Sequence, residues 1–270
     1  MKIPERIKLK EEIKHQKSQS IEIPLIIGGK EIRTGNMGKA VCPHNHGHVL
    51  ANYHRAGKEE AHLAVKSALA AKDEWELMPF ESRAAIFLKA AELLAGKYRY
   101  VINAATMLNQ SKNAYQAEID SACELIDFWR FNPYWAQFIY TQQPNNLQGI
   151  WNRIEHRPLE GFVFAITPFN FTAIGGNLPT SPALMGNVSL WKPAETAVLS
   201  SYYIMKVLQE AGMPDGVINF IPGPSQEIGS LLLQHPELAG VHFTGSTEVF
   251  HHIWRTIGNN IAGYKSYPRI

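Results

Sequence analysis

Cysteine is scarce in this chain, and long hydrophobic runs are missing. The two cysteines, Cys42 and Cys123, form no Cys-x-x-Cys motif and no Cys/His ligand spacing. This pattern excludes a disulfide framework and a structural zinc site, and it fits a reducing compartment. No run of about 18 apolar residues occurs, and no apolar segment follows the basic N-terminus, so neither a membrane span nor a secretory signal is expected.

An excess of charge of either sign is also missing. The chain has 26 Lys and Arg against 24 Asp and Glu, a formal net charge of +2, so a nucleic-acid surface is not indicated. With 45% hydrophobic and 19% charged residues among 270, the composition is that of a globular protein of one large domain or slightly more. Residues 1–20 are rich in Lys, Glu and Gln and are expected to be a polar leader, solvated and helical or frayed.

Short β segments are predicted first, followed by a long helical region. Residues 24–27 and 31–34 flank a Gly28-Gly29 turn and predict a hairpin. Residues 57–140 are predicted to be helical, and residues 141–160 are polar and turn-rich, which indicates a boundary or a hairpin that leaves the main body. Two apolar stripes at helical spacing predict core faces: Ile86, Ala90, Leu93 and Leu94, then Ile119, Ala122, Cys123 and Ile126. A thiol on such a stripe is expected to be buried and inert.

Two groups of polar side chains in this half have a structural and a functional interpretation. His44, His46 and His48 alternate and could bind a metal from one face of a strand, but neighbouring Pro, Asn and Gly residues favour a turn. On the predicted helix, Asp120, Glu124 and Asp127 share one face, which is typical of a solvated acidic surface paired with Arg130.

From Gly161 the pattern alternates between strands and helices. Apolar runs begin at Phe162, Val188, Val217 and Gly240 and are separated by helical segments. Four nearly continuous apolar strands between helices predict an α/β fold with a doubly wound parallel sheet, Rossmann-like, covered on both faces. In such a sheet the ligand lies beyond the carboxyl ends of the strands.

The residues after these strands suit a nucleotide. Gly245-Ser-Thr opens a helix and can bind pyrophosphate through backbone N–H groups, although Ser and Thr are also common N-caps. Lys192 and Glu195 can hydrogen-bond ribose hydroxyls, or form a surface ion pair. Asn170 offers an amide N–H that can stabilise an oxyanion, or it forms a turn.

Four motifs, in this order and spacing, resemble the NAD(P)-dependent aldehyde dehydrogenase superfamily: Pro168-Phe-Asn-Phe, Trp191-Lys-Pro-Ala-Glu-Thr, Ala211-Gly-Met-Pro-Asp-Gly-Val-Ile-Asn and Phe243-Thr-Gly-Ser-Thr-Glu-Val. Further segments are similar to the 1-pyrroline-5-carboxylate dehydrogenase branch of proline breakdown: Ala117-Glu-Ile-Asp, Glu124-Leu-Ile-Asp-Phe-Trp-Arg-Phe-Asn, Asn170-Phe-Thr-Ala-Ile-Gly-Gly-Asn-Leu and Pro182-Ala-Leu-Met-Gly-Asn-Val. The resemblance runs from about residue 21 to residue 270, so that whole range is expected to be an NAD-binding domain.

The resemblance implies oxidation of L-glutamate γ-semialdehyde to glutamate with NAD, through attack of a Cys thiolate and hydrolysis by a Glu-activated water. It also implies the site residues: Asn170 as oxyanion donor, Lys192 and Glu195 at the adenine ribose, Gly245 and Ser246 at the pyrophosphate, Thr167, Pro168 and Phe169 along the cofactor, and Glu124 and Phe171 at the substrate. A carboxylate at position 195 favours NAD over NADP, because it repels a 2′-phosphate. A homo-oligomer in the cytoplasm, or in the mitochondrial matrix of a eukaryote, is expected.

The sequence departs from the superfamily pattern in two ways. Phe250 stands where most members have a glycine, which is expected to alter the approach of the helix to the dinucleotide. The catalytic domain of the family, with its Cys and Glu, lies C-terminal to residue 270, so the chain alone is expected to be inactive. A non-catalytic nucleotide-binding or assembly module, and an aldehyde dehydrogenase of other specificity, remain alternatives.

Overall fold

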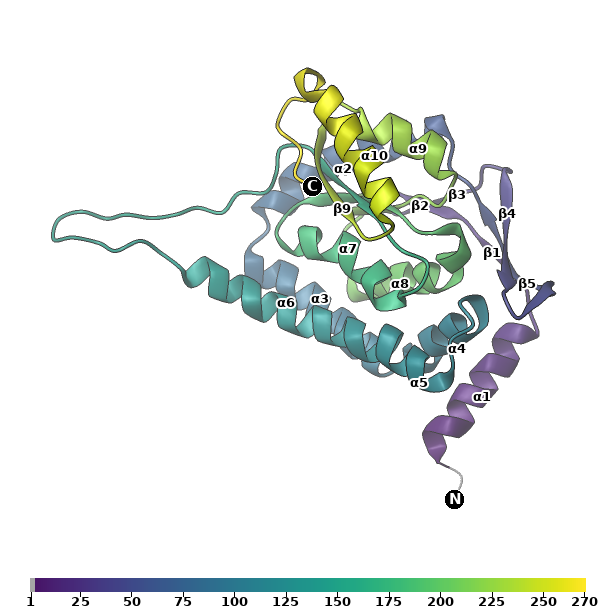
Figure 1. The fold of residues 1–270 in the computed structure, drawn as a ribbon. Coiled ribbons are helices and arrows are strands. Elements are labelled where there is room, and N and C mark those ends of the chain that lie inside the picture. The colour runs from purple at the N-terminus through teal and green to yellow at the C-terminus, as the bar shows by residue number, and fades with distance from the viewer. Residues whose placement is uncertain (1–2) are drawn as a thin grey trace.

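A six-stranded sheet lies at the centre of the molecule. The computed structural model describes residues 3–270 of the chain. The strand order is β3-β2-β8-β7-β6-β9. The bounds are β2 Leu25–Ile27, β3 Lys30–Ile32, β6 Phe162–Ile166, β7 Val188–Lys192, β8 Ile218–Phe220 and β9 Leu238–Phe243. The four strands β6 to β9 are parallel neighbours, which confirms the alternating α/β pattern (Figure 1).

The sheet as a whole is mixed, however, whereas a doubly wound parallel sheet preceded by a separate hairpin was expected. The predicted hairpin forms as β2 and β3, but β2 also pairs antiparallel with β8 through Ile26 and Phe220. All three residues of β2 are buried. A strand that is apolar on both faces is stabilised by a place inside a covered sheet, and this explains why the hairpin extends the large sheet instead of standing apart.

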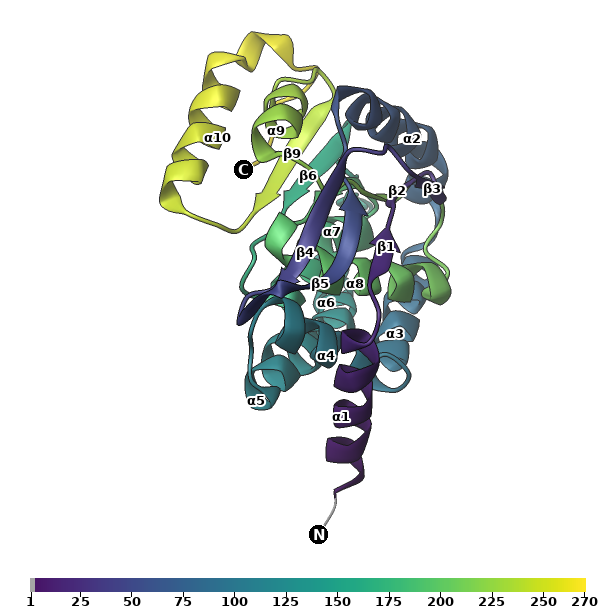
Figure 2. The ribbon, with the colours of Figure 1, turned by 90° about the vertical axis from the view of Figure 1, so that its right-hand side faces the viewer.

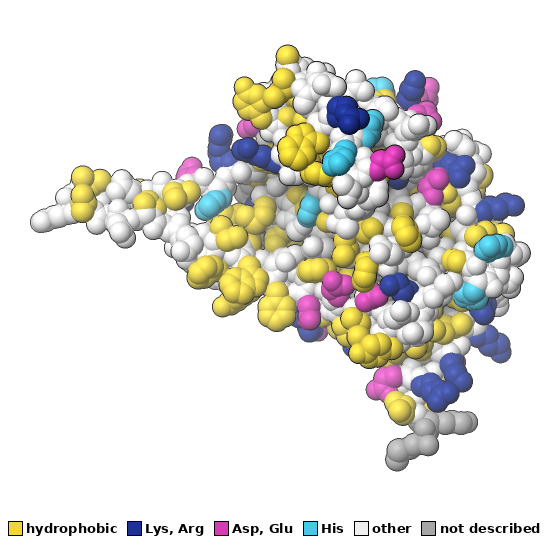
Figure 3. All heavy atoms as spheres, in the orientation of Figure 1, with side chains coloured by type: hydrophobic (Ala, Val, Ile, Leu, Met, Phe, Trp, Pro, Cys, Tyr) yellow, Lys and Arg dark blue, Asp and Glu magenta, His cyan; other side chains and the backbone are white. Residues whose placement is uncertain are grey.

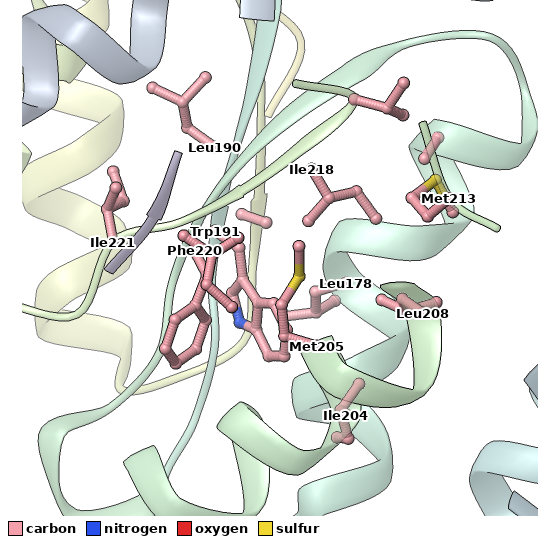
Figure 4. Close-up of a cluster of buried hydrophobic side chains, with 14 of the residues drawn as sticks. Leu178, Leu190, Trp191, Ile204, Met205, Leu208, Met213, Ile218, Phe220 and Ile221 are labelled. Carbon is pink, nitrogen blue, oxygen red and sulfur yellow. The ribbon is translucent and has the colours of Figure 1, made fainter. Parts of the chain in front are cut away.

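Helices cover both faces of the large sheet. Helices α2 (Lys58–Leu77) and α9 (Ser225–Leu233) lie on one face, and α7 (Thr172–Leu184) and α8 (Val198–Ala211) lie on the other. Figure 4 shows the core between the sheet and α8, where Trp191 and Phe220 meet Ile204, Met205 and Leu208. The rings of Trp191 and Phe220 pack edge to face, with their centroids 5.2 Å apart.

An outer helical layer packs against α7 and α8. It consists of α3 (Phe80–Ala95), α4 (Arg99–Asn109) and α6 (Glu124–Thr141). Helix α6 approaches α7 so closely that a Cβ added at Gly176 would lie 2.8 Å from a methyl group of Leu125. Glycine at this position therefore allows the two helices to meet.

The first apolar stripe lies on the core side of α3 as expected. In the second stripe Ala122 and Ile126 are buried as expected, but Ile119 and Cys123 are not. Between α5 (Ala114–Ala117) and α6 the chain forms a π-helix, Glu118–Cys123. A π-turn contains an extra residue, so the spacing that defines an α-helical face no longer applies. Ile119 is consequently 42% exposed. Cys123 is only partly buried, and burial together with the nearby Glu118 raises the pKa of its thiol.

A second, small sheet has the order β1-β5-β4 and faces the viewer in Figure 2. Its strands are β1 Ile21–Ile23, β4 Met37–Cys42 and β5 Asn45–His54, with the expected turn at Pro43. His44 lies in this turn, where its ring contacts Cys42 Sγ at 3.0 Å and Ser111 Oγ at 2.8 Å. Among residues 3–270 no group of three or more His, Cys, Asp or Glu side chains is arranged to hold a metal. The metal hypothesis for the histidine row therefore has no structural support.

The N-terminal residues form helix α1 (Pro4–Lys17), and one side of it packs against α4. Gln16 is buried there, and its amide donates to the carbonyl of Val101 at 3.0 Å. The leader is thus helical and largely exposed, as expected, but one side of it docks on α4, which the sequence did not predict. Across the described part of the chain, none of the helices combines the length and the apolar character needed to cross a bilayer.

Residues 142–160 leave the body of the molecule as a long excursion without helix or strand (Figure 1). The excursion is less polar than expected, because it exposes Leu147, Ile150, Trp151 and Ile154. Exposed apolar side chains continue along α6, and Figure 3 shows them on the same side of the molecule. Those of α6 are Phe131, Tyr134, Trp135, Phe138 and Ile139.

Candidate functional site

A cleft of about 1290 Å³ opens at the carboxyl ends of the parallel strands, between α9 and α10 (Thr247–Asn259). This is the edge at which a parallel α/β sheet binds its ligand. Eight of the ten residues singled out from the sequence line the cleft: Thr167, Pro168, Phe169, Asn170, Lys192, Glu195, Gly245 and Ser246. Side chains from three separate strand ends therefore meet in one place, as expected.

Lys192 ends β7 on the floor of the cleft. Its side chain is buried, with the residue only 4% exposed, and Nζ donates to the carbonyl of Pro193 at 3.3 Å. Burial lowers the pKa of this amine, and the carboxylate of Glu195 opposes that shift. Such a buried amine, with one long hydrogen bond to protein, has unused donors to offer a ligand.

Glu195 does not pair with Lys192, so the interpretation of the two as a surface ion pair was wrong. Its Oε1 accepts a hydrogen bond from Nε of Arg55 at 2.8 Å. Arg55 follows β5 of the small sheet and is 140 positions away in the sequence. Sequence reasoning missed this arginine because no local pattern links residues so far apart.

The strand end after β6 supplies a buried hydroxyl and two exposed side chains. Thr167 is buried, and its Oγ1 accepts a hydrogen bond from Nε1 of Trp191 at 3.1 Å. Phe169 and Asn170 are exposed at the cleft. The wall of the cleft at Thr167 is thereby tied to the hydrophobic core beneath it.

The turn before α10 caps that helix and also lines the cleft. Ser246 is the N-cap of α10, and its Oγ accepts from the backbone N–H of Val249 at 3.3 Å. A Cβ added at Gly245 would lie 2.5 Å from the ring of Phe243, so a larger residue here displaces that ring. Phe250 packs edge to face on Trp254, and Val249 lines the cleft in its place. Phe250 is thus not among the residues that line the cleft, and its effect on the approach of α10 to a dinucleotide stays a prediction.

The sequence analysis named the start of α10 but none of the residues inside α9 and α10. Residues of these helices line the cleft: Ser225, Gln226, Gly229, Ser230, His251, His252 and Arg255. A Cβ added at Gly229 would meet no atom within 4 Å, so the helix surface there borders open space. The Pro222-Gly-Pro-Ser segment after the third strand could have indicated these residues, because it leads into a helix that starts at the ligand edge of the sheet.

Glu124 and Phe171, the two remaining candidates, are not among the residues that line the cleft. Lys112 links Phe171 to Asp120: its Nζ donates to Asp120 Oδ2 at 2.8 Å and lies 4.5 Å from the centre of the Phe171 ring. Burial, and then the charge of Asp120, raise the pKa of Glu124. Arg130, the partner expected for this acidic face, instead pairs with Glu92 on α3 at 2.6 Å. Glu124 and Asp127 lie on α6 together with Arg130, and of the three acidic residues only Asp120 belongs to the π-helix.

Comparison with known proteins decides the family. The model of the aldehyde dehydrogenase family matches residues 32–265. The chain belongs to this family. The resemblance seen in the sequence motifs is confirmed.

Among aldehyde dehydrogenases, the chain is similar to a probable delta-1-pyrroline-5-carboxylate dehydrogenase of Schizosaccharomyces pombe, with 54% identity over 93% of this chain and 46% of that protein. A mitochondrial delta-1-pyrroline-5-carboxylate dehydrogenase of Dictyostelium discoideum is also 54% identical, over 97% of this chain and 48% of that protein. The solved delta-pyrroline-5-carboxylate dehydrogenase of Mycobacterium tuberculosis bound with NAD superposes with a TM-score of 0.98 at 50% identity, covering all of this chain and 51% of that one.

The chain thus spans about half the length of the curated aldehyde dehydrogenases it matches. The high TM-score extends over the complete chain, including both sheets and the helices around the cleft. This half therefore has the architecture of the corresponding half of those enzymes.

Proposed function

We propose that this chain is the NAD-binding half of an enzyme that oxidises L-glutamate γ-semialdehyde, formed from 1-pyrroline-5-carboxylate, to glutamate in proline catabolism. The cleft at the carboxyl ends of the strands carries the proposal, since eight residues implied by the family resemblance meet in it. The similarity to pyrroline-5-carboxylate dehydrogenases, one of them solved with NAD, supports the choice of cofactor and substrate.

The residues of the cleft fit a dinucleotide. The buried amine of Lys192 and the carboxylate of Glu195 are matched to the hydroxyls of a ribose. The open space beside Gly229 suits a flat group lying against α9, because no side chain fills it. Gly245 and Ser246, at the N-terminus of α10, are placed for the pyrophosphate, where backbone N–H groups and the helix dipole favour an anion. Thr167, Pro168 and Phe169 extend the cofactor site along the strand end.

NAD supplies a hydride acceptor when it is bound there. In this chain Asn170 offers its neutral amide N–H to an oxyanion, and removal of such a donor typically costs about 3 kcal/mol of transition-state stabilisation. We assign the nucleophilic Cys and the general-base Glu to the half of the relatives that this sequence does not match. Cys42, which is buried, and Cys123, which hydrogen-bonds Glu118, take no part in the reaction.

A titration of the 270-residue chain with NAD tests the cofactor assignment. Saturable binding with one site per chain is expected, and no binding at millimolar NAD would refute the assignment. The intact mass of the natural protein in its source cell tests whether this chain is one half of a longer enzyme. A mass well above 30.3 kDa is expected. A mass equal to that value would replace catalysis by nucleotide binding or assembly as the function.

Glu124 and Phe171 are proposed to contact the substrate, and replacement of Glu124 by Ala tests the specificity. In an enzyme that carries both halves, Glu124→Ala is expected to raise KM for glutamate γ-semialdehyde roughly tenfold, because a carboxylate that binds the substrate ammonium is lost. KM for an uncharged aliphatic aldehyde is expected to change much less. Glu92→Ala, which removes an exposed carboxylate on α3, is the matched control. Equal losses for the two aldehydes would remove the assignment of glutamate γ-semialdehyde.

The assembly and the compartment complete the proposal. A homo-oligomer accounts for the exposed aromatic side chains of α6 and the excursion, since apolar surface of this kind is commonly covered by a partner. The mitochondrial matrix is proposed for a eukaryotic source and the cytoplasm for a bacterial one, which agrees with the name of the Dictyostelium relative.

A further inference from the structure

The guanidinium of Arg55 bridges the small sheet and the ligand cleft. Its Nε donates to Glu195 Oε1 at 2.8 Å, and both side chains are 33% exposed. Glu195 lies at the start of the short 3-10 helix Glu195–Ala197, directly after β7. A positive charge from a different part of the chain therefore lies against the one carboxylate that the proposed function places at the adenine ribose.

The backbone around Arg55 is held on both sides. Its N–H donates to the carbonyl of Asn36 at 2.7 Å, and its carbonyl accepts from Thr34 Oγ1 at 3.0 Å. The next residue, Ala56, donates to the carbonyl of Pro222 at 2.8 Å, which anchors the segment to the loop before α9. The backbone position of Arg55 is thus fixed by these hydrogen bonds and does not depend on Glu195.

The side chain of Arg55 has a second support. Its guanidinium lies 5.6 Å from the centre of the Tyr53 ring, and one of its terminal nitrogens is 3.5 Å from the Tyr53 hydroxyl. Tyr53 is itself buried, with 1% exposure. The guanidinium therefore keeps its place beside the cleft even when the charge of Glu195 is removed.

We infer that Arg55, through its ion pair with Glu195, sets the discrimination between NAD and NADP, an inference that rests on the proposed binding of NAD in this cleft. In the ion pair the guanidinium donates to the carboxylate of Glu195, so that donor is not available to a 2′-phosphate. The carboxylate meanwhile occupies the position that the phosphate requires. Neutral ribose hydroxyls are accepted, and a dianionic phosphate is excluded.

The same arrangement predicts what happens when the carboxylate is neutralised. Glu195→Gln removes the repulsion and leaves an uncompensated guanidinium within hydrogen-bond range of residue 195. Arginine binds phosphate through two parallel N–H donors, which makes it well suited to this group. Two cations line the cleft, Lys192 and Arg255, so an experiment has to separate their effect from that of Arg55, which contacts the cleft residue Glu195.

Calorimetric titration of the full 270-residue chain with NAD and with NADP makes this separation. Glu195→Gln is expected to strengthen NADP binding at least roughly tenfold, the size of one charge-assisted contact. Adding Arg55→Met is expected to abolish that gain, whereas adding Arg55→Lys is expected to keep part of it. Arg55→Gln is a second charge-removing variant, in case the methionine disturbs the fold. NAD binding by each variant reports whether the cleft is intact.

Arg33→Met is the matched control, because Arg33 pairs with Glu22 of β1 and Glu31 of β3, neither of which lines the cleft. It is expected to leave the ratio of NAD to NADP affinity unchanged. If Glu195→Gln gains no NADP binding, or if the gain survives removal of the Arg55 charge, the role of Arg55 is refuted while NAD binding stands. If the unaltered chain binds no NAD, the proposed function fails together with the inference.

Discussion

Replacement of Trp191 by alanine is expected to lower the free energy of unfolding by about 3–5 kcal/mol, the cost of emptying a large buried aromatic site. Trp191 is fully buried in β7, where it packs on Phe220 and on the side chains of α8 (Figure 4). Its indole N–H also donates to Thr167, so the substitution leaves a buried hydroxyl without this donor at the wall of the cleft. Chemical denaturation of the chain in urea measures the loss.

Trp254→Ala is the matched control, because the same side chain is removed from a site that is 60% exposed on α10. A surface change of this kind is expected to alter stability by less than about 0.5 kcal/mol. Similar losses for the two tryptophans would contradict the assignment of Trp191 to the centre of the core.

Replacement of Lys192 by methionine is expected to weaken NAD binding by about ten- to a hundredfold. Methionine keeps the length of the side chain and removes the ammonium, so the change reports the loss of one charge-assisted donor, worth about 1.5–3 kcal/mol. The buried position of Lys192 makes water a poor substitute for it. Lys30→Met, on an exposed side chain of β3, is the control and is expected to bind NAD normally. An unchanged NAD affinity in Lys192→Met would contradict the proposed contact between Lys192 and the ribose of NAD.

The pH dependence of the same site follows from the lowered pKa of Lys192. Because burial lowers it from 10.5, the ammonium is lost at a lower pH in the folded chain than in the unfolded one. NAD affinity is therefore expected to fall as the pH rises, beginning below 10.5. The unfolded chain binds more protons in the same window, so the contribution of Lys192 to stability rises as the pH increases through it. Lys192→Met is expected to flatten both trends, and titrations between pH 8 and 10 measure them.

Local patterns were sufficient to predict the strands and most of the cleft. Each strand after residue 161 is a short apolar run between helices, so neighbouring residues alone identify it. The topology rule for parallel sheets then brings the residues that follow β6, β7 and β9 to one edge. Thr167, Lys192 and Gly245 were located in this way, because their positions follow from the ends of the strands.

Contacts between distant segments were not predictable from such patterns. The pairing of β2 with β8 joins residues almost two hundred positions apart, and nothing in either strand specifies the other. The π-helix was missed for a different reason. Its network joins Glu118 to Arg99 and Asn103 of α4, and these contacts stabilise a turn that local propensity does not favour.

The sequence by itself determined the family, the alternation of strands and helices and the residues at the ligand edge, because these depend on hydrophobic periodicity and on short motifs. The tertiary structure alone decided the mixed sheet, the docking of α1, the position of Glu124 and the partner of Glu195. Each of these depends on charge or packing between segments far apart in the chain. Arg55 is the clearest case: it becomes a neighbour of Glu195 only when the small sheet docks beside the cleft.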